Sequence, residues 1–388
     1  MKILQVFDFF SPHGGGTVDL LGKISGALAG KGHEVEIYTS DYKLDEGYIA
    51  ALPEVTIRPF HCVMALANYY YAPGFKRAVQ KHLSDFDVAH LHCFRSYQNI
   101  VISREAPRAG VPYVLDTHGS LPRQTPGTTD GKAPLRSLFD MFWGKRILNN
   151  AGRLVAETQL GMSEYRQVGV PEERIALVPP PFETQAFADL PQPGAFRRRF
   201  GLENKKIVMF LGRIHRIKGL DVLAAGFTEL AKREPAARLV IVGNDDGYKA
   251  ALEKLIKRLG IAEKVIFAGF LNGPEKLEAL VDADVVAQTS RYEQGAWAPF
   301  EAVLCGTPIV VSDNSGAGED VAKHEAGYLA AFGDEKDLAE KLAWVLANPQ
   351  EAGRKTARAR QHIITDLSLE KGIERYEQLY QAVTRRQD

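Results

Sequence analysis

The sequence predicts an α/β protein built from two doubly wound parallel sheets, one in each half of the chain. Short apolar runs rich in β-branched residues alternate with amphipathic helical patterns, and this alternation pauses once and then starts again. Apolar strands separated by helices are typical of parallel sheets that are covered on both faces. The length of 388 residues suits two domains of ordinary size.

The first series begins with "KILQVF" (2–7), which is expected to be a buried strand. An amphipathic helix follows over 17–32 and ends at a glycine, as helices often do. Further strands are expected at 33–39, 88–92, 113–117 and 153–158.

The alternation pauses over "LVPPPFETQAFADLPQPGAF" (177–196). Five prolines in this window exclude a sheet interior or a helix middle. The predicted organisation is therefore a first domain over 1–183, a linker over 184–203, a second domain over 204–365 and a final amphipathic helix within 366–388. The second domain is expected to contain strands at 206–212, 238–243, 264–269, 285–290 and 308–313, with helices at 219–231, 248–259, 274–281 and 299–305.

Composition narrows the class of protein. Lys plus Arg equals Asp plus Glu, at 48 each, so nothing favours nucleic acid or another strongly anionic partner. Three cysteines without a C-x-x-C pair favour a reducing compartment. The N-terminal stretch lacks the features of a signal peptide, and no apolar run approaches roughly 18 residues. We expect a cytoplasmic protein.

The stretch "SRYEQGAWAPFEAVLCGTPIVVSD" (290–313) holds two glutamates, Glu293 and Glu301. If a helix begins near Ala298, Pro299 occupies its first position and Glu301 its first turn, while Glu293 lies in the preceding loop. Both carboxylates could then line one cavity beside free backbone N–H groups near Gly295 and Ala296, which favour an anion. The alternative is that Glu301 caps its own helix and Glu293 is solvated.

A second candidate site is "FLGRIHRIKGLD" (210–221), where Arg213 and Lys218 flank a strand-to-helix turn. Two cations at a helix N-terminus oppose the helix dipole, and an anion held between them would relieve the conflict. The alternative is a pair of ordinary surface cations.

Two loops of the first half complete the candidates. "SPHGGGTVD" (11–19) is a glycine-rich turn that suits a phosphate or a close ligand backbone, although it lacks the dinucleotide fingerprint. "DTHGS" (116–120) places His118 after a strand, where it could donate to a ligand hydroxyl or act as a base. A structural turn and a loop histidine are the alternatives. A metal site in "HLHC" (90–93) is disfavoured because successive strand residues face opposite sides, and the pair Asp282 and Asp284 favours turn chemistry over a metal.

In this order, the glycine-rich loop, the histidine loop, G-R-x-x-x-x-K-G and E-x7-E followed by "CGTPI" resemble the retaining glycosyltransferases of family 4, also called glycosyl transferases group 1. The resemblance runs from about residue 2 to the final helix. It implies the GT-B fold, in which two Rossmann-like domains face each other across a cleft. It also implies that the first domain lies on the acceptor side and that the second binds the nucleotide-sugar.

The resemblance implies a role for each matching residue. Arg213 and Lys218 would hold the diphosphate of a nucleotide-sugar in place of a metal, and Glu301 would bind the ribose. Glu293 would contact the transferred sugar. The other residues that would contact donor or acceptor are His118, Gly15, Gly16, Gly295, Ala296, and Phe270 and Leu271 beside the base. The family usually has E-G-F-G where this chain has "EQGAW", which leaves the donor sugar open.

The implied activity is retaining transfer of a sugar from a UDP- or GDP-linked donor to a hydroxyl acceptor, with no metal and no other cofactor. The acceptor would be lipid-linked or an oligosaccharide in polysaccharide or glycolipid synthesis. Residues 132–147, "KAPLRSLFDMFWGKRI", could form an interfacial helix for peripheral membrane contact or a core-packed helix. The alternatives in function are a nucleotide-sugar epimerase of the same two-domain plan and a non-catalytic nucleotide-sugar binder.

Overall fold

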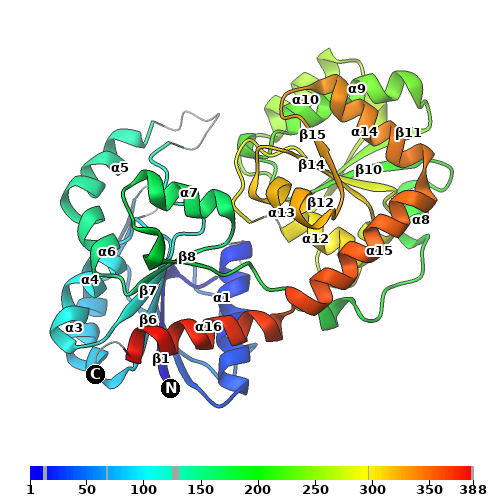
Figure 1. Cartoon of the computed structure of the whole chain (residues 1–388). Coiled ribbons are helices and arrows are strands. Elements are labelled where there is room, and N and C mark those ends of the chain that lie inside the picture. Colours follow the sequence, from blue (N-terminus) through cyan, green and yellow to red (C-terminus); the bar gives the residue numbers. More distant parts are fainter. Residues whose placement is uncertain (12–14, 67–68, 125–130, 296, 386–388) are drawn as a thin grey trace. The chain divides into compact units, whose positions relative to one another are not determined.

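The computed structural model describes residues 1–11, 15–66, 69–124, 131–295 and 297–385, which fold into two compact units (Figure 1). The first unit comprises the described residues up to 182 together with those from 367 onward. The second unit comprises residues 183–366. Each unit holds one parallel sheet with helices packed against it, which confirms the predicted α/β class.

The sheet of the first unit has the strand order β3-β2-β1-β6-β7-β8-β9, and each described pairing in it is parallel. Its strands are β1 (Lys2–Phe9), β2 (Glu34–Ser40), β3 (Thr56–Phe60), β6 (Val88–His92), β7 (Tyr113–Asp116), β8 (Arg153–Ala156) and β9 (Ile175–Leu177). A short antiparallel pair, β4 (Met64–Leu66) and β5 (Tyr69–Tyr71), lies outside this sheet. The edge strands β3 and β9 were not predicted. They are partly exposed and therefore lack the apolar runs that mark the central strands.

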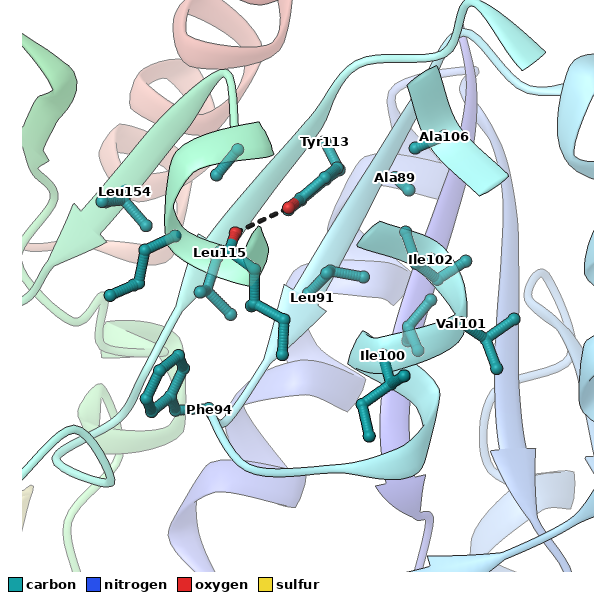
Figure 2. Packing of buried hydrophobic residues seen from close by; sticks show 14 of the residues in the cluster. Ala89, Leu91, Phe94, Ile100, Val101, Ile102, Ala106, Tyr113, Leu115 and Leu154 are labelled. Carbon is teal, nitrogen blue, oxygen red and sulfur yellow. Dashed lines mark hydrogen bonds between the residues drawn. The ribbon is translucent and has the colours of Figure 1, made fainter. Parts of the chain in front are cut away.

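The helices of the first unit are α1 (Gly16–Gly30), α2 (Glu46–Ala50), α3 (Pro73–His82), α4 (Tyr97–Ala109), α5 (Ala133–Phe139), α6 (Lys145–Asn150), α7 (Gln159–Gln167) and α16 (Leu369–Thr384). Alternate residues of β1, β6, β7 and β8 share one buried cluster with residues of α4. Leu91 of β6 and Leu115 of β7 join Ile102 of α4 in one buried cluster (Figure 2). The hydroxyl of Tyr113 donates to the carbonyl oxygen of Ile147 at 2.6 Å, which satisfies its polar end within this layer.

The final helix, α16, belongs to the first unit. It packs against α1 and contacts β6 and β7 (Figure 1). Where the chain leaves and re-enters this unit, Phe182 donates its N–H to the carbonyl of Leu367 and accepts from the N–H of Leu369, both at 2.7 Å. The side chains of Tyr376 and Tyr380 are fully buried beneath α16.

The sheet of the second unit has the strand order β12-β11-β10-β13-β14-β15, again with parallel pairing. Its strands are β10 (Lys206–Leu211), β11 (Ala237–Val242), β12 (Val265–Gly269), β13 (Val285–Gln288), β14 (Ile309–Ser312) and β15 (Tyr328–Ala330). The helices are α8 (Ala195–Phe200), α9 (Leu220–Arg233), α10 (Lys249–Arg258), α11 (Gly273–Asp282), α12 (Trp297–Leu304), α13 (Gly316–His324), α14 (Glu335–Ala347) and α15 (Pro349–Asp366).

Residues 184–203, which we expect to link the domains, are part of the second unit. They contain α8, which packs against α11. The carboxylate of Asp282 accepts the backbone N–H groups of Gly194 at 2.5 Å and Arg197 at 2.9 Å, and Asp284 pairs with the Arg197 guanidinium. The two aspartates therefore anchor α8, which accounts for their spacing without a metal.

Candidate functional site

The order of strands in the second sheet reverses between β10 and β13, so the loops that follow these two strands leave in opposite directions. Open parallel sheets bind ligands at such a switch point, outside the carboxyl ends of the strands. Lys218 lies in the loop after β10, at the end of a single 3₁₀ turn (Arg216–Lys218), and Glu293 lies in the loop after β13. The predicted pair of loops thus meets at this switch point.

Lys218 and Glu293 form a half-enclosed ion pair. The Nζ atom of Lys218 lies 2.6 Å from both carboxylate oxygens of Glu293, and each side chain is only 14% exposed. The same carboxylate accepts from the hydroxyl of Ser290 at 2.8 Å and from the Nε2 of Gln288 at 3.1 Å. Four donor contacts therefore hold Glu293 in one orientation, and the alternative that it is a solvated loop residue is excluded.

Close backbone contacts hold the loop after β10 against the loop after β13. Gly219 has φ +63°, and a Cβ atom there would lie 1.8 Å from the carbonyl oxygen of Thr289, so only glycine fits. The hydroxyl of Thr289 donates to the carbonyl of Gly219 at 2.9 Å, and the N–H of Arg291 donates to the carbonyl of Ile217 at 2.8 Å. These contacts set the position of Lys218 relative to Glu293.

Arg291 makes further contacts between these two loops. Its guanidinium donates to the carbonyl of Arg216 at 2.9 Å and forms a two-point ion pair with Asp221 of α9. Nothing in the motif pattern identified Arg291 or Asp221. Their spacing of 70 residues gives no local signal, and only the folded sheet brings them together.

Arg213 does not share a partner with Lys218. Its Nη1 atom lies 2.6 Å from the carboxylate of Asp246, in the loop after β11, and its side chain is 62% exposed. Within the described residues, no bond joins Arg213 to Lys218. The expected conflict between these two cations and the helix dipole is thus relieved here by two separate carboxylates.

Glu301 lies deeper in its helix than expected. α12 begins at Trp297, so Pro299 is its third residue and Glu301 its fifth. The proline still costs no intrahelical bond, because the first four N–H groups of a helix have no acceptor within it. The Glu301 carboxylate accepts from Nζ of Lys276 in α11 at 2.8 Å, a long-range pair in place of the helix cap that was the alternative.

The remaining candidates of the second unit lie around these loops. Gly295 is half-buried in the loop before α12, and Ala296 lies outside the described residues. Phe270 and Leu271 follow β12. Phe270 is 59% exposed, whereas Leu271 is buried.

The glycine-rich loop belongs to the first unit and follows β1. Gly15 is the N-cap of α1 with φ +68° and Gly16 is the first residue of that helix, and both are exposed. The preceding residues 12–14 lie outside the described part of the chain.

His118 also lies in the first unit, just beyond the carboxyl end of β7. Its backbone is left-handed, with φ +44°, and its N–H donates to the carboxylate of Asp116 at 3.0 Å. The imidazole is 5% exposed. Its Nδ1 atom lies 2.9 Å from Glu157, and its Nε2 atom lies 2.8 Å from Nδ1 of His92. Both ring nitrogens are thus occupied by protein groups, which the sequence could not show.

The charge of His118 follows from this setting. Burial alone would lower the pKa of His118, but the carboxylates of Asp116 and Glu157 outweigh it and raise that pKa to about 8. Burial also raises the pKa of Asp116. Ligand atoms of these three residues lie within 4.8 Å of one another, but an imidazolium paired with carboxylate accounts for the cluster.

The pair His90 and His92 needs a correction. Successive strand residues do face opposite sides, but these two are separated by one residue and share a face of β6, with ring centroids 4.1 Å apart. Both are buried, and burial lowers the pKa of each, that of His90 to about 3. They are neutral core residues.

No helix in the described part of the chain combines the length and apolar character needed to span a membrane. The segment 133–144 is nonetheless rich in exposed apolar side chains. Leu135, Leu138, Met141 and Phe142 are each about half or more exposed.

Comparison with known proteins shows which families this chain resembles in sequence. The family described as glycosyl transferases group 1 matches residues 194–362, and the glycosyl transferase 4-like domain matches residues 15–181. The D-inositol 3-phosphate glycosyltransferase of Rhodococcus jostii is 28% identical over 361 residues, which cover 86% of this chain and 77% of that protein.

Solved structures match over nearly the whole chain. HepE of Anabaena, in complex with UDP-glucose, has a TM-score of 0.80 at 20% identity, covering 98% of this chain and 100% of that one. Sucrose-phosphate synthase of Thermosynechococcus elongatus has a TM-score of 0.80 at 20% identity and covers 100% of both chains. These likenesses concern the fold.

Proposed function

Because the chain belongs to the glycosyl transferases group 1 family and has the GT-B fold of two Rossmann-like units, we propose that it transfers a sugar from a nucleoside-diphosphate sugar to a hydroxyl group of an acceptor. The transfer retains the anomeric configuration and uses no metal. The observation that carries the proposal is the Lys218–Glu293 pair at the switch point of the second sheet.

The relatives support this donor class. The Rhodococcus jostii relative is named a D-inositol 3-phosphate glycosyltransferase, and the Anabaena structure holds UDP-glucose. A nucleoside diphosphate is a polyanion, and a switch-point crevice that presents a lysine suits its binding.

In the proposed complex, Lys218 exchanges its partner. The diphosphate takes the place of Glu293 at the lysine Nζ, and Glu293, still held by Ser290 and Gln288, is freed to accept a hydroxyl of the transferred sugar. Arg213, which is largely exposed, swings from Asp246 to the same diphosphate. Two cations would then stabilise the charge that builds on the leaving group, the electrostatic contribution that is usually the largest.

The rest of the nucleotide extends along the same sheet edge. Glu301, with one oxygen held by Lys276, accepts the ribose hydroxyls through the other. Gly295 offers its backbone N–H group in the loop before α12. Phe270 and Leu271 border the base.

In the first unit, the loops that follow β1 and β7 carry the remaining candidate residues. Gly15 and Gly16 permit donor and acceptor to approach the backbone closely, because neither carries a side chain. The loop after β7 that carries His118 contacts the sugar. The imidazole acts there as a buried positive charge, because both of its ring nitrogens are bound to protein groups and its pKa is raised to about 8 by the carboxylates of Asp116 and Glu157.

Retention would follow from attack on the same face from which the diphosphate leaves, with that diphosphate taking the acceptor's proton. A mechanism like that of glycosidases, in which two carboxylates flank the glycosidic bond, fits this site less well. In the proposed complex Glu293 still accepts from Ser290 and Gln288, and Glu301 still pairs with Lys276, so neither carboxylate is a free nucleophile.

We further propose that the first unit contacts an anionic membrane surface, where a lipid-linked acceptor would be met. The exposed apolar side chains of 133–144 support this, because one segment presents Leu135, Leu138, Met141 and Phe142 to solvent. A groove of about 700 Å³ in the same unit adds cations, from Lys76, Arg104, Arg108 and Arg146. Together they offer apolar insertion and electrostatic attraction.

The test is a donor screen. UDP- and GDP-sugars are ranked by the rise in melting temperature, since a ligand that binds only the folded state stabilises it by mass action. Nucleotide release is then followed with and without a hydroxyl acceptor, and the anomeric configuration of the product is determined by NMR. Acceptor-dependent release with retention supports the proposal, whereas an epimerised donor would identify an epimerase, and binding without turnover a binding protein.

A further inference from the structure

A buried row of polar side chains crosses the core of the first unit. Gln5 of β1 and His90 of β6 are register partners in adjacent strands, and His92 lies two residues further along the same face. This face is covered by α16. Gln5, His90 and His92 are each at most 1% exposed, and Tyr380 of α16 is fully buried beside them. Apolar residues would fill this layer without the desolvation cost of polar groups.

The row forms a continuous chain of hydrogen bonds from α16 to His118. Nδ1 of His90 lies 2.8 Å from the Tyr380 hydroxyl, which lies 3.4 Å from Nε2 of Gln5. Oε1 of Gln5 lies 2.8 Å from Nε2 of His92. Nδ1 of His92 lies 2.8 Å from Nε2 of His118.

The number of hydrogens on each group determines which group donates and which accepts at each step of this row. Oε1 of Gln5 can only accept, so His92 carries its hydrogen on Nε2 and presents a bare Nδ1 to His118. Nε2 of His118 must then donate. At the other end, the amide of Gln5 donates to Tyr380, whose hydroxyl donates to Nδ1 of His90.

The hydrogen bonds of this row can also point in the opposite direction, and the protonation state of His118 then changes. If the Gln5 amide turned over, His92 would accept from it at Nε2 and carry its hydrogen on Nδ1. His118 would then face a donor and would have to offer a bare Nε2. Its Nδ1–H would remain on Glu157, so His118 would be neutral. The orientation of one buried amide is therefore coupled to the charge of His118.

We propose that Gln5, His92 and Tyr380 are positioning residues that act through His118, holding its ring with Nε2–H directed into the protein and so keeping it an imidazolium. This rests on the proposed function, in which the His118 loop contacts the transferred sugar. Through this row of hydrogen bonds, Tyr380 of α16 would thus set the charge of His118 beside the sugar. Within the described residues, the ionisable groups that face His118 are Asp116 of β7, Glu157 after β8, and His90 and His92 of β6.

The test uses two tyrosines of the same helix. Tyr380→Phe removes the hydroxyl that anchors the Gln5 amide, whereas Tyr376→Phe removes an equally buried hydroxyl of α16 that takes no part in the chain. The pKa of His118 is followed by imidazole NMR on the free, full-length protein. We expect it to fall by at least about 0.5 unit in Tyr380→Phe, the size of one hydrogen bond, and to stay unchanged in Tyr376→Phe. Equal values in both variants would overturn the proposal.

A measurement on the unmodified protein covers the case in which Tyr380→Phe does not fold. Nitrogen chemical shifts should report His92 and His90 as neutral tautomers with hydrogen on Nε2, and His92 with hydrogen on Nδ1 would overturn the proposal. Neither NMR readout depends on sugar transfer, so a failed donor screen would leave this result intact. If transfer is observed, the alkaline limb of its kcat/KM profile should shift down in Tyr380→Phe along with the pKa of His118.

Discussion

The ammonium of Lys218 lies 2.6 Å from both carboxylate oxygens of Glu293, although the two residues are 75 positions apart in the chain. The pair is formed by two loops that leave the switch point of one sheet, and Gly219 against Thr289 fixes the distance between them. A lysine and a carboxylate held together at this point can separate around a bound diphosphate.

Replacing either partner should abolish most of the transfer. We expect Lys218→Ala and Glu293→Ala each to lower sugar transfer by at least about 10²-fold, the usual effect of removing one electrostatic contact at a transition state. The measurement is kcat/KM for the donor found in the screen. Lys232→Ala is the matched control, because Lys232 forms an exposed ion pair with Glu229 in the same unit. Near-normal transfer in Lys218→Ala with an intact fold would refute the role of the pair.

Gly219→Ala should destabilise the second unit and misplace Lys218. The alanine would adopt a left-handed backbone, at about 1–2 kcal/mol, and its Cβ would also collide with the Thr289 carbonyl. Gly260→Ala separates the two effects, since Gly260 has φ +71° but no atom within 4 Å of a built Cβ. Urea unfolding should show a clearly larger loss for Gly219→Ala. Equal losses of unfolding free energy in Gly219→Ala and Gly260→Ala would mean that the contact between the two loops is not rigid.

Asp8 should give the first unit a pH-dependent stability. Burial raises the pKa of Asp8 to about 7, opposed by a hydrogen bond from Ser96, whereas the unfolded chain titrates near 3.8. This contribution to stability is therefore present below about pH 4 and is lost as the pH rises to about 7. Asp8→Asn should remove that slope and be more stable than the unmodified protein at about pH 8.

Chemical unfolding at several pH values checks the Asp8 prediction. The exposed carboxylate of Asp19 in the same unit provides the control, Asp19→Asn. An Asp8→Asn variant whose unfolding free energy keeps the original pH slope would contradict the assignment of that slope to Asp8.

Membrane contact should depend on the exposed apolar side chains of 133–144. We expect the protein to float with vesicles that contain phosphatidylglycerol and not with pure phosphatidylcholine, because the nearby groove is cationic. Phe142→Glu should abolish flotation. Val168→Glu, at another exposed apolar position of the same unit, should not. Flotation that survives Phe142→Glu would place the contact elsewhere.

Much of the fold could be predicted from the sequence because the central strands are buried on both faces. Val88–His92 has the predicted bounds, and β1 and β10 differ from their predictions by only one or two residues at an end. The partly exposed strands β3 and β15 could not be predicted, since pairing with a neighbour rather than apolar composition defines them.

The sequence indicated correctly that Lys218 and Glu293 lie in loops that follow strands, and the structure brings these two residues together. The candidate site was not predictable where a partner is supplied by another strand. The pairs of Arg213 with Asp246 and Lys276 with Glu301 have no sequence signature. His90 and His92 did carry a signal, because residues two apart on a strand share a face, but it concerned a buried layer rather than a metal.

The paired backbone of Phe182 and Leu367 makes the second unit an insertion into the first, because the chain departs and returns at neighbouring points. Such a topology permits excision. A linker of about three residues is long enough to join 182 to 367, and it would leave every strand of the first sheet and its closing helix in one shortened polypeptide. That polypeptide would allow the hydrogen-bonded row of Gln5, His90 and His92 to be studied in isolation from the second unit.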